Sequence, residues 1–231
     1  MFLQAVLVLG TVRKRFSVMS APSGMARLGQ TCCCLAWLLI TAPVASLAQS
    51  NLRNTFPGNR MGGGTRGECS ARLVAHLVPA NSVYAPGASG MIGILEGPTA
   101  NPRPLQVVVK PDVQPSANAI QRDLPASGPG VTLLTIGAVQ GAKLWESAYR
   151  CDQSQASGSG LGLDFVDSAS PPAKSMLVAD VQSSDQRVAA SLQILKTSCG
   201  KAVPTATVAK AFGLEDAITA AWPQQLPVRC L

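Results

Sequence analysis

A glycine-rich stretch at residues 61–69, Met-Gly-Gly-Gly-Thr-Arg-Gly-Glu-Cys, has the residue types of an anion-binding loop. Successive backbone N–H groups can form a concave nest for an anion, and a nearby arginine adds positive charge. A phosphate-binding P-loop also needs a lysine after the glycines and a helix behind it, and neither is expected here. Because polyglycine loses much entropy when it becomes ordered, we favour a hinge leading to a fold secured at Cys69. The anion-binding alternative would use Gly62, Gly63, Gly64, Thr65 and Arg66.

Few residues in the chain could support catalysis. His76 is the only histidine, and it stands within an apolar run at residues 73–78, where a hydrogen-bonded structural histidine is expected. The G-x-S-x-G motif of serine hydrolases is absent. Asp164 and Asp167 could act as an acid–base pair, although turn carboxylates are far more common. We therefore predict no catalytic residues, no metal site and no cofactor.

The cysteines fall into two groups. Of the seven, three lie together at residues 32–34 in an apolar segment and read as small hydrophobic residues. An even number of remaining cysteines in an exported chain predicts two disulfides, with three possible pairings. We favour Cys69 with Cys230, which would join the two ends of the folded region, and Cys151 with Cys199. The four disulfide candidates are Cys69, Cys151, Cys199 and Cys230.

Residues 25–48 have the pattern of a signal peptide. Arg27 precedes an apolar core at residues 32–40, and the small residues Ser46 and Ala48 place the cleavage site between Ala48 and Gln49. The apolar core is shorter than the roughly 20 residues of a membrane span, so an uncleaved anchor is the weaker alternative. The whole leader is residues 1–48, which is either an unusually long leader or one whose translation begins later, at Met19 or Met25. A leader that begins at Met25 is complete by itself, which favours a translation start there. This pattern predicts a periplasmic or secreted protein with no membrane span after cleavage.

The charge of the chain argues against nucleic acid as a partner. The 19 basic and 12 acidic residues give a net charge of +7, but four of the basic residues lie in the leader. The remainder carries 15 − 12 = +3, and its basic residues are scattered rather than clustered. A partner therefore stays unknown, with another exported or envelope protein as the candidate class.

The remaining chain reads as a flexible Gly-rich arm at residues 49–68 and a single β-rich domain at 69–231. Apolar runs predict strands at 71–79, 91–97, 105–110, 131–137, 142–151 and 160–166, while 174–181 could be a strand or the start of a helix. We expect the strands at 131–137 and 142–151 to form a hairpin, and residues 111–130 to form an irregular loop. Within 142–151, Trp145, Ser147 and Tyr149 share one face.

The tail predicts helices at 185–196, 205–212 and 215–222. In the first of these, Val188, Leu192 and Leu195 form an apolar stripe and Ser184 is the expected N-cap. These helices need a surface to cover. We therefore predict an α+β fold, with an antiparallel, sandwich-like β body and short C-terminal helices packed on it.

Four segments carry a resemblance to a known family. The segments are 56–69 (FPGNRMGGGTRGEC), 76–81 (HLVPAN), 141–152 (GAKLWESAYRCD) and 226–230 (LPVRC). With them the sequence is similar to an uncharacterised family of exported cyanobacterial proteins, a domain of unknown function. The resemblance implies export and a domain that spans nearly the whole mature chain. The family has no established activity, so it implies no catalytic residues.

These observations favour an exported, non-catalytic binding or structural module. One alternative is a cell-envelope hydrolase that uses Asp164, Asp167 or His76. Another is an accessory subunit of a larger exported protein, whose Gly-rich arm folds on contact with its partner.

Overall fold

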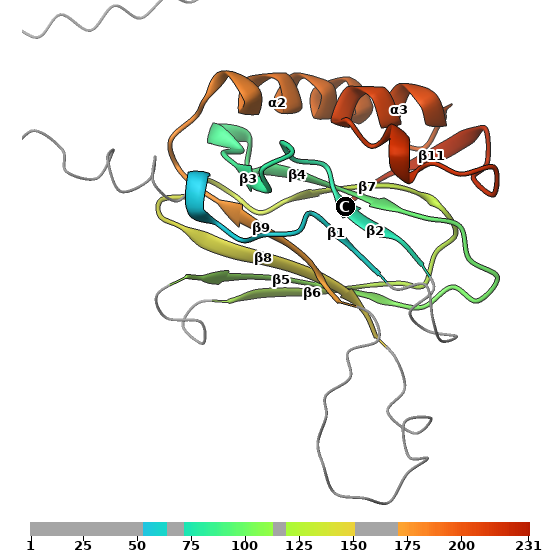
Figure 1. The fold of residues 1–231 in the computed structure, drawn as a ribbon, viewed down its shortest axis with the longest axis horizontal. Coiled ribbons are helices and arrows are strands. Elements are labelled where there is room, and N and C mark those ends of the chain that lie inside the picture. Colours follow the sequence, from blue (N-terminus) through green and yellow to red (C-terminus); the bar gives the residue numbers. More distant parts are fainter. Residues whose placement is uncertain (1–52, 64–71, 113–118, 151–170) are drawn as a thin grey trace, which may run out of the picture. The chain divides into compact units, whose positions relative to one another are not determined.

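The computed structural model describes residues 53–63, 72–112, 119–150 and 171–231 (Figure 1). These residues all belong to one compact unit of the chain. Strands dominate and a few short helices accompany them, so the predicted strand-rich α+β class is confirmed. The predicted leader and its cleavage site at Ala48 and Gln49 lie outside the described residues.

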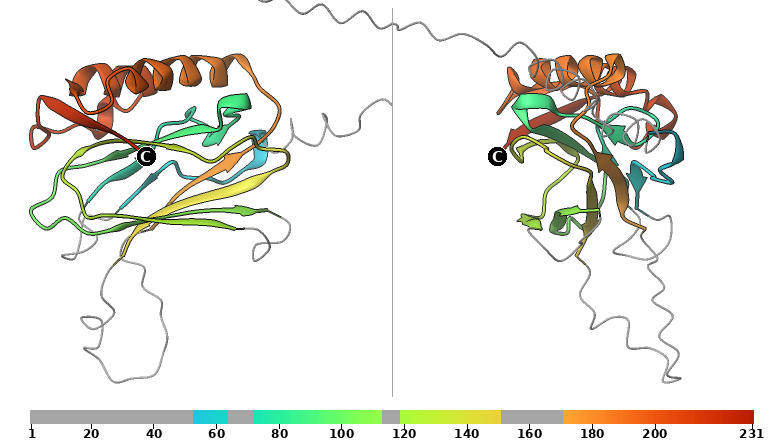
Figure 2. Two further views of the ribbon diagram at one scale, coloured as in Figure 1. Left: turned by 180° about the vertical axis from the view of Figure 1, so that it is seen from behind. Right: turned by 90° about the vertical axis from the view of Figure 1, so that its left-hand side faces the viewer.

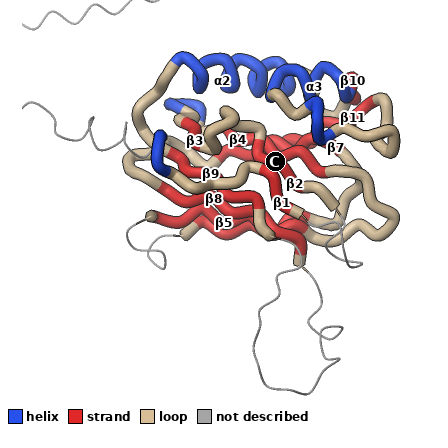
Figure 3. Tube along the Cα trace, viewed as in Figure 1, coloured by secondary structure: helices blue, strands red, loops and turns tan. Residues whose placement is uncertain are grey.

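Two mixed sheets form the body of the fold (Figure 3). The six-stranded sheet contains, in spatial order, β1 (Met61–Gly62), β2 (Val74–His76), β4 (Met91–Glu96), β7 (Gly130–Thr135), β11 (Gln225–Cys230) and β10 (Ala202–Pro204). The five-stranded sheet contains β3 (Val83–Tyr84), β9 (Ala173–Leu177), β8 (Lys143–Tyr149), β5 (Leu105–Pro111) and β6 (Ile120–Leu124). The prediction of an entirely antiparallel β body is wrong, because β11 runs parallel to β7 and β3 runs parallel to β9.

The two sheets enclose a common core, and helices cover the other side of the six-stranded sheet (Figure 1, Figure 2). Strand β7 is therefore buried on both faces, from Gly130 to Leu134. Strands β5 and β8 instead alternate between buried and half-buried residues. Among the described residues, neither α2 (Ser183–Lys196) nor α3 (Thr205–Phe212) covers their outward-facing side chains, so this face of the five-stranded sheet is more open than the six-stranded sheet.

Two of the three predicted helices are present. Helix α2 (Ser183–Lys196) buries Val188, Leu192 and Leu195, and α3 (Thr205–Phe212) ends at Gly213, whose φ of 59° suits glycine. The cap of α2 differs from the prediction, because Gln182 rather than Ser184 is the N-cap. The prediction of a third helix at 215–222 is wrong. Only the short turn η3 (Glu215–Ala217) forms, and the chain then enters β11.

The predicted hairpin between residues 131–137 and 142–151 is also wrong, because β7 and β8 belong to different sheets. The physical reason lies in their burial. A strand such as β7 that is apolar on both faces needs cover on both sides, whereas the alternating β8 suits a sheet with one open face. The predicted irregular loop at 111–130 likewise contains β6, an edge strand whose central residues are exposed and which lacks a β-branched pattern.

Residues 53–63, which we call the strap, join the two sheets. Strand β1 pairs with β2, and the His76 amide donates to the Arg60 carbonyl at 2.8 Å. On its other side, the strap accepts a hydrogen bond from the Lys174 amide at the Asn59 carbonyl (2.7 Å). The flexible arm predicted for residues 49–68 is therefore wrong for residues 53–63. Backbone pairing with both sheets, which composition does not reveal, holds them in place.

Gly62 is the tightest point of the strap. A Cβ at this position would overlap the backbone of Ala173 and Pro171. We expect Gly62→Ala to lower the free energy of unfolding by about 1–3 kcal/mol, because the strap must shift away from β9. Urea unfolding followed by circular dichroism measures this. Gly141→Ala is the control, since a Cβ there meets no atom within 4 Å, and an equal loss in both variants would contradict the prediction.

Candidate functional site

The predicted anion-binding glycines are partly used for backbone pairing. Gly62 belongs to β1, and the Gly63 amide donates to the Pro171 carbonyl at 2.9 Å. The φ of 94° at Gly63 explains the need for glycine at this position without a ligand. Gly64, Thr65 and Arg66 lie outside the described residues.

His76 lies between the two sheets and is completely buried. Its Nδ1 lies 2.8 Å from the Ser175 hydroxyl oxygen and its Nε2 lies 2.9 Å from that of Ser147. The Trp145 indole N–H donates to Ser147 at 3.1 Å, and the Trp145 and His76 rings stack with their centres 3.5 Å apart. Both histidine nitrogens are thus hydrogen-bonded inside the core, which is the structural role predicted for His76.

Burial holds the pKa of His76 well below its usual value of 6.5. Between pH 6.5 and that lowered pKa, the unfolded chain binds a proton at this residue and the folded chain does not. Acidification below pH 6.5 should therefore favour unfolding, by up to about 1.4 kcal/mol per pH unit from this residue. Urea unfolding from pH 7.5 to 5.5 should show a steeper loss of stability in the native protein than in His76→Gln. Equal slopes would contradict the prediction.

The structure contains a disulfide between Cys199 and Cys230, whose Cα atoms are 5.7 Å apart. The favoured pairings of Cys69 with Cys230 and Cys151 with Cys199 are therefore wrong. The reason is local. The segment after α2 pairs with β11 through hydrogen bonds from the Gly200 amide to the Val228 carbonyl and from the Val228 amide to the Lys201 carbonyl, both 2.8 Å long. Cys69 and Cys151 lie outside the described residues.

We expect the double change of Cys199→Ser and Cys230→Ser to lower the free energy of unfolding by about 2–4 kcal/mol, because the unfolded chain gains freedom. Peptide mapping of the non-reduced protein should yield the 199–230 cross-link, and a 69–230 cross-link would contradict it.

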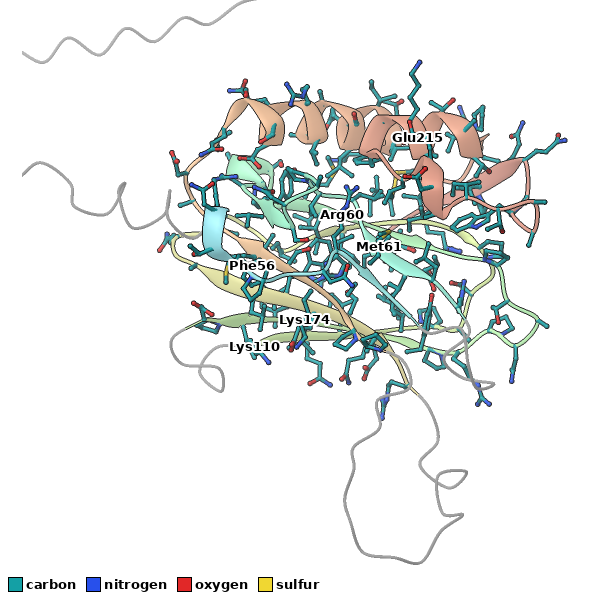
Figure 4. All side chains as sticks on the ribbon, viewed as in Figure 1. Phe56, Arg60, Met61, Lys110, Lys174 and Glu215 are labelled. Atoms are coloured by element: carbon teal, nitrogen blue, oxygen red, sulfur yellow. A yellow bond between two sulfur atoms is a disulfide. The ribbon has the colours of Figure 1, made fainter. Side chains whose placement is uncertain are left out.

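A groove of about 440 Å³ lies between the strap and the five-stranded sheet. One side consists of strap residues 55–58, which include the half-buried Phe56, and the floor contains Leu144 and Met176. Lys174 and Asp112 complete the lining. Figure 4 shows Phe56 on the strap and Lys174 on the neighbouring sheet. A volume of this size with an apolar floor and few charged groups is typical of small-ligand sites.

The charged groups beside the groove form a cross-strand cluster. Glu146 on β8 contacts the ammonium groups of Lys110 at 2.7 Å and of Lys174 at 3.3 Å. Partial burial of Glu146 raises its pKa, but the hydrogen bonds and charges of the two lysines outweigh that effect and the net pKa is lowered. Glu146 is therefore ionised at neutral pH, and two lysines share its single negative charge.

Two deeper ion pairs have structural roles. Arg53, the first described strap residue, contacts Asp185 on α2 at 2.7 Å. Arg72 contacts Glu96 at 3.2 Å, and its guanidinium lies 5.0 Å from the Tyr149 ring centre. Burial raises the pKa of Glu96, although Arg72, Ser127 and Arg229 act in the opposite direction. The side chains of both ion pairs are buried, so neither pair is accessible to a ligand.

Sequence reasoning missed the groove. Its lining comes from four segments far apart in the chain, and no motif joins Phe56, Asp112 and Lys174. The alternation in β8 was the only available signal, since it separated the buried Trp145 from the half-buried Leu144. The predicted acid–base candidates Asp164 and Asp167 lie outside the described residues.

Comparison of the chain with protein-family models, with curated proteins and with solved structures finds no match. Within the described ranges, no helix is both long enough and apolar enough to cross a membrane. In the same part of the chain, no group of three or more His, Cys, Asp or Glu side chains could hold a metal ion.

Proposed function

We propose that the protein is an exported, non-catalytic binding module, periplasmic or secreted, and that the groove beneath the strap is its ligand site. The groove carries the proposal, because an apolar floor with Lys174 and Asp112 beside it provides both contact area and orientation for a small ligand. The burial of His76 supports a non-catalytic role, since the only histidine does not reach solvent.

Export is supported by the leader pattern at residues 25–48 and by the disulfide, a bond that persists in oxidising compartments. The resemblance to exported cyanobacterial proteins of unknown function points the same way. N-terminal sequencing of the protein recovered from a bacterial host should give Gln49 as the first residue. An intact leader on the recovered protein would count against export.

Binding is tested with the full chain expressed with its leader and labelled with ¹⁵N for NMR. A library of small fragments should produce shifts at the amides of Phe56, Leu144, Lys174 and Met176. Phe56→Ala should weaken these shifts, whereas Met61→Ala, an exposed change on the same strap, should not. Shifts confined to other surfaces would refute the groove as the ligand site. Thermal unfolding of each variant separates lost binding from lost folding.

A further inference from the structure

The two ends of the groove carry opposite, unbalanced charges. At one end, Lys110 and Lys174 share the carboxylate of Glu146, which leaves one positive charge in excess. The side chain of Lys174 is 47% exposed, against 26% for Lys110, so Lys174 is the more accessible of the two. An ammonium group has three N–H donors, and a single contact with Glu146 leaves donors for a ligand.

Asp112 supplies the negative charge at the other end. It is exposed, its backbone amide donates to the Ala142 carbonyl at 3.2 Å, and no described residue pairs with its carboxylate. Its place in the lining thus leaves a carboxylate available to a cationic or N–H donor group.

The strand register sets the separation of these charges. Lys174 lies opposite Glu146, which lies opposite Val108 on β5, and Asp112 is four residues further along the chain from Val108. Four residues correspond to about 13 Å along the strands, and the step of two strands from β9 to β5 adds about 10 Å across them, so the Cα atoms of Lys174 and Asp112 are about 16 Å apart. Between the two ends lies the row in which Leu144 faces Met176 on one side and Lys110 on the other, with Phe56 on the strap side. The ammonium group of Lys110 reaches Glu146, so Leu144, Met176 and Phe56 supply the apolar part of this row. An elongated ligand would thus meet a positive end, an apolar centre and a negative end in order.

We propose that the groove binds a short peptide with free termini, placing its carboxylate at Lys174, its amine at Asp112 and an apolar side chain on Leu144 and Met176. The inference rests on the proposed function, because it assigns a ligand class to the same groove. An extended tripeptide spans about 10 Å, which matches the register once the reach of the lysine side chain is included. Opposite charges at the two ends also select one direction of binding, since the reverse direction brings like charges together.

The test uses the tripeptide Ala-Leu-Ala in four forms: free, C-amidated, N-acetylated and blocked at both ends. NMR titration of the full chain expressed with its leader measures the affinity of each form. The free peptide should bind most tightly, and each blocked end should weaken binding about two- to fivefold, as expected for partly exposed charge pairs. The doubly blocked peptide should bind most weakly.

Two variants assign each end of the peptide. Lys174→Met should abolish the difference in affinity between the free and the amidated peptide, and should keep the difference in affinity between the free and the acetylated peptide. Asp112→Asn should keep the first difference in affinity and abolish the second. Lys210→Met, an exposed change on α3, should alter neither difference.

The outcomes separate the two proposals. Equal binding of all four peptides at the groove, or tighter binding of the blocked forms, would overturn the peptide assignment and leave the groove as a ligand site. If none of the four peptides shifts the groove amides while fragments of other chemistry do, the peptide assignment alone fails. If no probe of any kind shifts them, the proposed function fails as well.

Discussion

Replacing Asp185 by alanine is expected to lower the free energy of unfolding by about 3–5 kcal/mol, because it leaves Arg53 as an unpaired buried charge. The side chains of Arg53 and Asp185 are 3% and 0% exposed, and their closest atoms are 2.7 Å apart. Asp185 also accepts a hydrogen bond from the Gln182 amide at 2.8 Å, as part of the capping box of α2. The change therefore removes both the partner of Arg53 and a helix cap. Urea unfolding at neutral pH measures the effect.

Two further variants locate the cause of the loss. Asp185→Asn keeps an oxygen for the Gln182 amide but removes the charge, so it should lose most of the ion-pair contribution while keeping the cap. In a double-mutant cycle, Arg53→Met should cost much less in the Asp185→Ala background than in the native protein. Additive losses would show that the two side chains act independently and would contradict the prediction.

Trp145→Ala should also lower the free energy of unfolding by about 3–5 kcal/mol, the range typical of large core truncations. Trp145 is fully buried between the sheets and stacks on His76. Its indole N–H is also one of the hydrogen-bond partners of Ser147. Removal of the ring would open a cavity and weaken the group that joins β2, β8 and β9. Chemical unfolding monitored by far-ultraviolet circular dichroism gives the size of the loss.

Trp145→Phe is the matched variant. It keeps an aromatic ring against His76 but removes the N–H donor to Ser147, so its loss should be clearly smaller than that of the alanine variant. A similar loss in both would mean that the hydrogen bond rather than packing dominates. A loss below about 1 kcal/mol in Trp145→Ala would contradict the role of this ring in the core.

The strap begins close to the predicted cleavage site of the leader. Arg53 lies only four residues after Gln49, the predicted first residue of the mature chain. Its pairing with Asp185 holds the beginning of the strap against α2, and the strap in turn forms one side of the groove. Weakening this pair should therefore disturb the groove as well as the stability of the fold.

Local patterns in the sequence were enough to predict the elements with strong periodicity. Alternation in β8 separated the buried face of Trp145, Ser147 and Tyr149 from the half-buried one, and the stripe of Val188, Leu192 and Leu195 predicted α2. The isolated His76 in an apolar run indicated a structural histidine. These features depend only on residues close together in the sequence. The side-chain periods of strands and helices appear directly in the order of apolar and polar residues, so such features can be predicted.

Tertiary contacts decided the rest. The partner of Cys230, the sheet to which β7 belongs and the fixed position of the strap all depend on which distant segments lie side by side. The groove has the same origin, because Phe56, Asp112 and Lys174 share no pattern and meet only through the register of β5, β8 and β9. Composition and spacing thus determined a strand-rich chain with a leader pattern, buried faces and paired cysteines. Backbone pairing over long sequence distances selected the cysteine partner and the residues that form a surface for a ligand, since such pairing leaves no local signature.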